Sequence, residues 1–95
     1  MTISNKYRKQ IKQFFYKYKQ LLKIPNYWYV TIRINNNIKE YANVEFEYDK
    51  KIFKININPK RNKRLNTLKD SILHELIHVL FSPTTNRIDN LLLKS

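Results

Sequence analysis

The 95-residue sequence has no cysteine and no glycine, and only seven acidic side chains stand against 19 lysines and arginines. Without cysteine the chain can form neither a disulfide nor a thiolate metal site. No apolar run approaches the roughly 18 residues of a membrane span, and the polar, lysine-rich start is unlike a secretory signal. These absences favour a cytoplasmic protein, or one of the host cytoplasm if its source is viral.

The sequence does contain enough apolar side chains for a folded core. Hydrophobic residues make up 42% of the chain and aromatic residues 14%, which argues against disorder. A chain of 95 residues suits one modest core rather than two. We therefore expect residues 1–95 to form a single domain.

The net charge of +12 makes nucleic acid a possible partner through basic surfaces. The densest basic stretch is Lys60, Arg61, Lys63 and Arg64. However, Lys, Asn, Ile, Tyr and Phe have A/T-rich codons, so an A/T-rich genome such as that of a phage would supply lysine without selection for DNA binding. A solvated charged surface is also the commoner case. No residue is therefore assigned to nucleic-acid binding.

Hydrophobic spacing predicts an N-terminal helix and three strands. Apolar residues recur at steps of three and four over residues 3–23, with Ser4 or Thr2 as a possible cap. Aromatic and β-branched residues fill 27–34, which reads as a strand. Residues 41–48 and 52–57 alternate apolar and polar side chains and predict an antiparallel hairpin.

Two helices are predicted after the hairpin. Thr67 and Asp70 suggest a capping box for a helix that runs to Phe81, where Ser82-Pro83 would end it. A last short helix is expected from 86 to 94. Charge pairing across the hairpin, with Lys51 and Lys54, is the expected role of Glu45 and Glu47.

The stretch from Ser71 to Leu80 contains His-Glu-x-x-His, and the motif ends are the only histidines of the chain. Four-residue spacing places His74 and His78 on one helix face, where both can bind one Zn²⁺. Glu75 lies about 100° further round, where a general base would stand. The other positions between 72 and 81 are apolar, so the polar groups need a partner. The alternative is a helix with ordinary hydrogen-bonded core histidines.

This motif and its uncharged flanks resemble those of the zincin metallopeptidases, in particular the minigluzincins and the small His-Glu-x-x-His proteins of phages and archaea. The resemblance implies an N-terminal helix, a small, mainly antiparallel three-stranded sheet and an active-site helix. With the short C-terminal helix, the expected fold is a minimal zincin-like α+β domain.

The resemblance also implies a zinc-dependent metallopeptidase, a hydrolase that cleaves a peptide or protein substrate. A Zn²⁺-activated water would attack the peptide carbonyl, with Glu75 as general base. In zincins the strand before the active-site helix edges the cleft and pairs with substrate. The resemblance therefore makes Phe53, Lys54, Ile55 and Asn56 the candidate substrate-binding residues. A protein this small has a shallow cleft, which implies a narrow or latent enzyme.

A catalytic zinc needs a third protein ligand beside the two histidines. A metzincin extension is excluded by Phe81 and Thr84, and no Glu follows Glu75, so the gluzincin pattern is not completed. Asp89 is the only acidic residue after the motif, and a turn at Pro83 would let its helix fold back over the metal. Asp89 is the predicted ligand. The alternatives are Glu40, Glu45 and Glu47, or a weak site with two histidines alone.

Two other functions are compatible with the sequence. A zincin scaffold could serve a nucleic-acid-associated regulator, which the positive charge would suit. It could also be a structural zinc-binding module without catalysis, stabilised by its metal.

Overall fold

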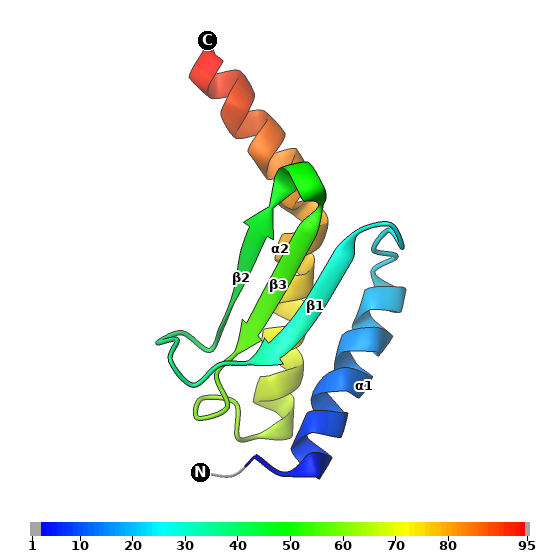
Figure 1. Ribbon diagram of the computed structural model, residues 1–95, viewed down its shortest axis with the longest axis vertical. Helices are drawn as coiled ribbons and strands as arrows, with labels where there is room; N and C mark the ends of the chain where they lie inside the picture. The colour runs from blue at the N-terminus through cyan, green and yellow to red at the C-terminus, as the bar shows by residue number, and fades with distance from the viewer. Residues whose placement is uncertain (1–2, 95) are drawn as a thin grey trace.

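A computed structural model describes residues 3–94, and the side chains of all of these except residue 48 and residues 82–94. The elements are α1 (Asn5–Leu21), β1 (Tyr29–Ile34), β2 (Ala42–Glu47), the short 3₁₀ helix η1 (Tyr48–Lys50), β3 (Ile52–Ile57) and α2 (Leu65–Lys94). The three strands form one sheet, α2 crosses one of its faces, and α1 lies beside β1 (Figure 1). The α+β class predicted from the sequence is confirmed.

The sheet is mixed rather than mainly antiparallel. Its strand order is β1-β3-β2, with β1 parallel and β2 antiparallel to β3. The predicted hairpin of β2 and β3 is confirmed. The parallel pair arises because the loop 35–41 carries the chain past the end of β3, so that β2 forms on the far side of β3 from β1.

The prediction that residues 52–57 form an edge strand is wrong. Strand β3 is central, and its main-chain groups already pair with both neighbours. Phe53 and Ile55 are completely buried, and Asn56 is 2% exposed. Lys54 alone of the four predicted substrate-binding residues is exposed. The two edges of the sheet are β1 and β2.

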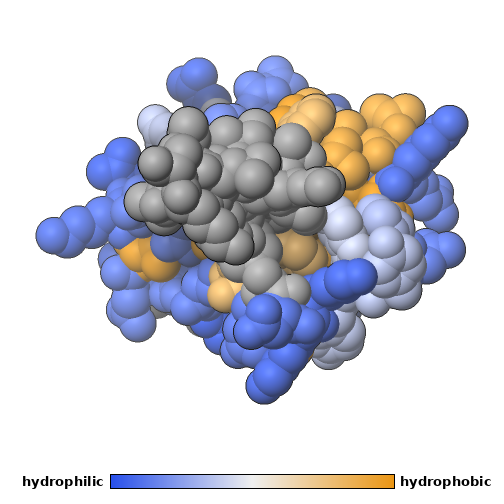
Figure 2. All heavy atoms as spheres, turned by 90° about the horizontal axis from the view of Figure 1, so that it is seen from above, coloured by the Kyte–Doolittle hydropathy of each residue, from blue (hydrophilic) through white to orange (hydrophobic). Residues whose placement is uncertain are grey.

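The core lies between the sheet and the two helices. Alternate residues of β3 point into it, and α1 and α2 contribute residues spaced three and four apart. The most deeply buried apolar residues are Phe53, Ile55, Ile57, Leu68, Ile72, Leu76 and Val79. From above, hydrophilic side chains surround most of the visible rim, with smaller hydrophobic areas between them (Figure 2).

Helix α1 is amphipathic, as its sequence spacing predicts. Ser4 caps its start, because the Ser4 side chain accepts a hydrogen bond of 3.1 Å from the N–H of Tyr7. Ile11 and Phe15, four residues apart, are its buried residues. Lysines and Arg8 occupy the other faces, and α1 has no acidic residue.

Helix α2 differs from the two helices that the sequence predicts. It begins at Leu65, two residues before Thr67, so Thr67 is not its N-cap. It also continues through Pro83 to Lys94 as one helix, and its last turns extend beyond the sheet (Figure 1). Proline removes one backbone donor and bends a helix, but flanking turns can keep the helix intact on both sides.

A buried asparagine connects both helices with two loops. The Asn62 side chain is fully buried, and its amide N–H groups donate 2.7 Å hydrogen bonds to the carbonyls of Tyr41 and Asn58. Its Oδ1 accepts 2.6 Å from the Ser71 hydroxyl of α2. The Tyr7 hydroxyl of α1 donates 2.9 Å to the Asn62 carbonyl. Every polar atom of this side chain is therefore satisfied.

Replacing Asn62 with alanine should destabilise the protein strongly. The change removes three side-chain hydrogen bonds and leaves the buried Ser71 hydroxyl without its acceptor, whereas the carbonyls of Tyr41 and Asn58 each keep one backbone N–H donor. We expect a loss of about 3 kcal/mol in the free energy of unfolding, measured by urea denaturation. Asn66→Ala, at an exposed position of α2, is the control and should change stability little. Equal stability of the two variants would contradict the proposed role of Asn62.

Candidate metal and peptidase site

The two histidines of the motif meet on the exposed face of α2. Their Nε2 atoms are 2.9 Å apart, and their rings are nearly perpendicular, at 83°. This closeness follows from the helix, because residues four apart project from the same side. Both side chains are exposed, so an ion or a substrate can reach them from solvent.

The pair fits the requirements of a single metal ion. Zinc binds imidazole nitrogen at about 2.0–2.1 Å, so two nitrogens on one ion lie within about 4.2 Å of each other. The observed 2.9 Å between the Nε2 atoms satisfies this limit. In the metal-free protein the same distance allows one protonated Nε2 to donate a hydrogen bond to the other.

Glu75, between the histidines in sequence, faces the protein interior. The residue is only 6% exposed, whereas His74 and His78 are exposed. It borders a cleft of about 450 Å³ between α2 and the start of β2. The cleft is lined by Tyr41, Ala42, Thr67, Asp70, Ser71, His74 and Glu75. The candidate base and one candidate ligand therefore border the same space.

Burial raises the pKa of the Glu75 carboxyl above its usual value of 4.5, because the charged form loses hydration. Positive charge on His78 and His74 acts in the opposite direction and lowers this pKa. The negative charge of Glu40 raises it further. Glu75 therefore holds a proton more tightly than an exposed glutamate does.

The candidate acids for the third metal ligand have different surroundings in the structure. Glu45 forms an ion pair of 2.9 Å with Arg33 and accepts a hydrogen bond of 3.2 Å from Asn56. Glu47 lies 3.7 Å from Lys50. Of these three alternatives, only Glu40 affects the pKa of Glu75, which its negative charge raises. Within the side chains that the structure describes, no group of three potential metal ligands is present.

Asp89 belongs to α2, and its side chain is outside the described residues. Helix α2 has no turn between the motif and Asp89, so the predicted folding back of a separate helix does not occur. In a continuous helix, the eleven positions from His78 to Asp89 correspond to about 16 Å along the axis. The assignment of Asp89 as a ligand stays a prediction.

The expected charge pairs of the hairpin have different partners from those predicted. Glu45 lies opposite Lys54 in the strand register, but its ion pair is with Arg33 of β1. Glu47 pairs with Lys50 of η1. Arg33 lies on β1 and Glu45 on β2, with β3 between them. The long Arg33 side chain reaches across the outer face of the sheet to Glu45.

Two residues that line the cleft, Tyr41 and Ser71, lie outside the His-Glu-x-x-His motif, so the motif does not predict them. Ser71 precedes His74 by three positions and therefore lies near the same side of α2. Tyr41 comes from the loop 35–41, and its ring lies 5.4 Å from the Arg61 guanidinium. Sequence spacing could have suggested Ser71, whereas Tyr41 reaches the cleft only through the path of the loop.

The basic segment 60–64 lies close to the start of α1. Lys63 and Arg64 share a cavity of about 280 Å³ with Lys6 and with Tyr7. The folding of the chain therefore concentrates positive charge there, but nucleic-acid binding through it stays a prediction.

Comparisons with protein-family models, curated proteins and solved structures found no match to this chain. In the part of the chain that the structure describes, no helix has the length and hydropathy to cross a membrane.

The raised pKa of Glu75 predicts a pH-dependent effect of Glu75→Gln. Glutamine imitates the protonated carboxyl, which burial favours. The stabilisation from protonated Glu75 is complete below the unfolded-state pKa and is lost as pH rises through the folded-state pKa. With chelator present, the variant should unfold at a higher temperature than the wild type at about pH 8, and the difference should shrink towards about pH 4.

Thermal unfolding across this pH range provides the measurement, and Glu47→Gln is the control because it removes the same charge from an exposed strand position. A gap between wild type and Glu75→Gln that does not change with pH would contradict the assigned effect of burial.

Proposed function

We propose that the protein is a zinc-dependent peptidase, with His74 and His78 as metal ligands and Glu75 as general base. The main support is the pair of exposed Nε2 atoms 2.9 Å apart, next to a buried glutamate on the same helix. A carboxylate and two imidazoles so arranged are the side chains that metal-assisted hydrolysis uses.

A bound Zn²⁺ supplies Lewis acidity that polarises a peptide carbonyl and makes water more acidic. Glu75 accepts a proton on its carboxylate and returns it to the leaving amine. The raised pKa suits this role, because a base is most effective when its pKa approaches the working pH. Glu75 and His74 both line the cleft, so the carboxylate and one imidazole border the space that a substrate would enter.

The substrate strand in this proposal is β2 rather than β3. Asn58 donates a 3.0 Å hydrogen bond to the Tyr41 carbonyl, so odd-numbered residues of β2 pair with β3. The main-chain groups of Ala42 and Val44 therefore point towards the other edge. Ala42 also lines the cleft, so an extended peptide along this edge would approach Glu75 and His74.

For the third ligand, the proposal keeps two acids. Asp89 follows the motif in sequence, and Glu40 precedes β2 and acts electrostatically on Glu75. Glu40 interacts electrostatically with Glu75 in the fold as it stands, whereas Asp89 would need a break in α2 to turn back towards the histidines. On this ground the proposal ranks Glu40 before Asp89.

The proposal predicts separable effects on metal binding and on catalysis. Wild-type protein should bind about one zinc per chain, and His74→Ala with His78→Ala should abolish binding. Glu75→Gln should retain zinc but cleave a peptide library about 10² to 10⁴ times more slowly. Metal analysis and mass spectrometry of the library are the measurements. Glu47→Gln should match the wild type in both, and undiminished cleavage by Glu75→Gln would refute the assigned base.

The same metal analysis distinguishes the two acids. If Glu40 is the ligand, Glu40→Gln should weaken zinc affinity about tenfold or more, and Asp89→Asn should leave it unchanged. The reverse result would support Asp89 and require a turn within α2. Unchanged affinity in both variants would leave the histidines as the only side chains among these that hold the metal.

A further inference from the structure

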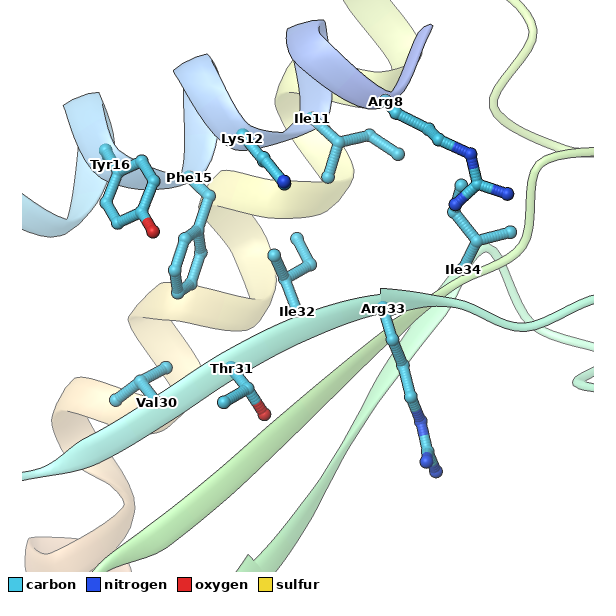
Figure 3. A pocket seen from close by; sticks show the side chains of 10 residues that line it. All are labelled: Arg8, Ile11, Lys12, Phe15, Tyr16, Val30, Thr31, Ile32, Arg33 and Ile34. Atoms are coloured by element: carbon cyan, nitrogen blue, oxygen red, sulfur yellow. The ribbon is translucent and has the colours of Figure 1, made fainter. Parts of the chain in front are cut away.

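A second groove lies at the edge of the sheet opposite to β2. It has a volume of about 240 Å³ and separates α1 from β1 (Figure 3). Helix α1 contributes Arg8, Ile11, Lys12, Phe15 and Tyr16, and β1 contributes residues 30–34. None of these residues lines the cleft beside His74, so this groove is a separate surface.

The open edge of β1 faces this groove. The N–H of Tyr29 donates 2.9 Å to Lys51, and the N–H of Asn35 donates 2.8 Å to Ile57. In a parallel pair, alternate residues bond to the same neighbour, so the odd-numbered residues of β1 face β3. The main-chain groups of Val30, Ile32 and Ile34 therefore face away from β3. Among the described residues, β1 pairs with no strand except β3.

Apolar side chains form the inner wall of the groove. Ile11 and Phe15 of α1 are 4% exposed, and Val30 of β1 is 7% exposed. The Ile32 side chain points from the strand towards α1 (Figure 3). An extended chain beside β1 would place alternate side chains against this wall, while its main chain bonds to the strand.

The rim of the groove is positive and has no acidic partner. Arg8 and Lys12 extend from α1 into this region (Figure 3), and no ion pair joins either to a described acidic side chain. Arg33 points away from α1, and its charge is compensated by Glu45 at 2.9 Å. The two cations on α1 are thus available to a ligand that carries negative charge.

We propose that this groove binds an extended acidic peptide segment of another protein, which adds a fourth strand beside β1. The free main-chain groups provide affinity for an extended backbone, and Arg8 and Lys12 select acidic side chains. A second copy of this chain fits poorly, because each copy carries a net charge of +12 and the two would repel. The inference does not depend on the proposed peptidase activity.

The test uses the full chain, isotope-labelled for NMR and titrated with a blocked heptapeptide, Glu-Thr-Val-Thr-Val-Thr-Glu. Its odd positions share one face, so valine meets the apolar wall while glutamate points to the side of Arg8 and Lys12. We expect saturable binding, with shifts and slowed hydrogen exchange at the amides of Val30, Ile32 and Ile34. A peptide with lysine in place of glutamate should not bind. A third peptide, with proline in place of valine, should also fail, because proline cannot donate to the strand.

A pair of double variants tests the charge contribution. Arg8→Glu with Lys12→Glu should weaken binding of the acidic peptide about tenfold or more. Lys9→Glu with Lys17→Glu changes the net charge equally at exposed positions of α1 outside the groove, and should alter affinity less than about twofold. Amide spectra of the free variants will establish that both remain folded.

Three results would overturn the inference. Equal weakening in both double variants would indicate general charge attraction. Chemical-shift changes confined to residues 60–64 would place the acidic peptide on the basic loop instead. Competition with the peptide for this loop by an added nucleic acid would give the same conclusion. Protection of the β1 amides without peptide, together with a dimer in sedimentation, would mean that a second copy occupies the edge.

Discussion

The hydrogen bonds of Asn62 are the constraint on which the arrangement of the site depends. The Asn62 amide holds the Tyr41 carbonyl on one side and the Ser71 hydroxyl on the other. Tyr41 and Ser71 both line the cleft beside Glu75, so one buried side chain sets the separation of its two walls. The Tyr7 hydroxyl adds α1 to the same network, and burial raises the pKa of this hydroxyl, which keeps its proton available for donation.

Helix α2 presents the motif residues to two different environments. His74 and His78 are accessible to solvent, where a metal ion can arrive, whereas Glu75 lies against the interior. The buried residues Leu76 and Val79 fix the rotation of α2 on the sheet, and this rotation keeps the histidine pair at the surface. The packing of α2 on the sheet therefore also determines which residues of the motif are exposed and which are buried.

Local patterns in the sequence predicted the strands and the α1 helix well, because period-two and period-3.6 spacing depend only on which face is buried. The place of β1 could not be predicted in this way. Its parallel pairing with β3 depends on the loop 35–41, which Asn58 and Asn62 hold through the carbonyls of Ile38 and Tyr41. Pro83 misled the prediction of α2, because proline disfavours a helix without forbidding it.

For the site, the motif spacing predicted that the two imidazoles share a face, and the 2.9 Å between their Nε2 atoms agrees with this geometry. The location of Glu40 near Glu75 had no comparable signal. It depends on tertiary contacts of a loop, which no periodicity encodes.

The mixed sheet also has a consequence for the folding pathway. The hairpin partners Glu47 and Ile52 are close in sequence, whereas Tyr29 must find Ile52 across a much longer loop. Because closing a longer loop costs more entropy, we expect β2 and β3 to associate early and β1 to dock late.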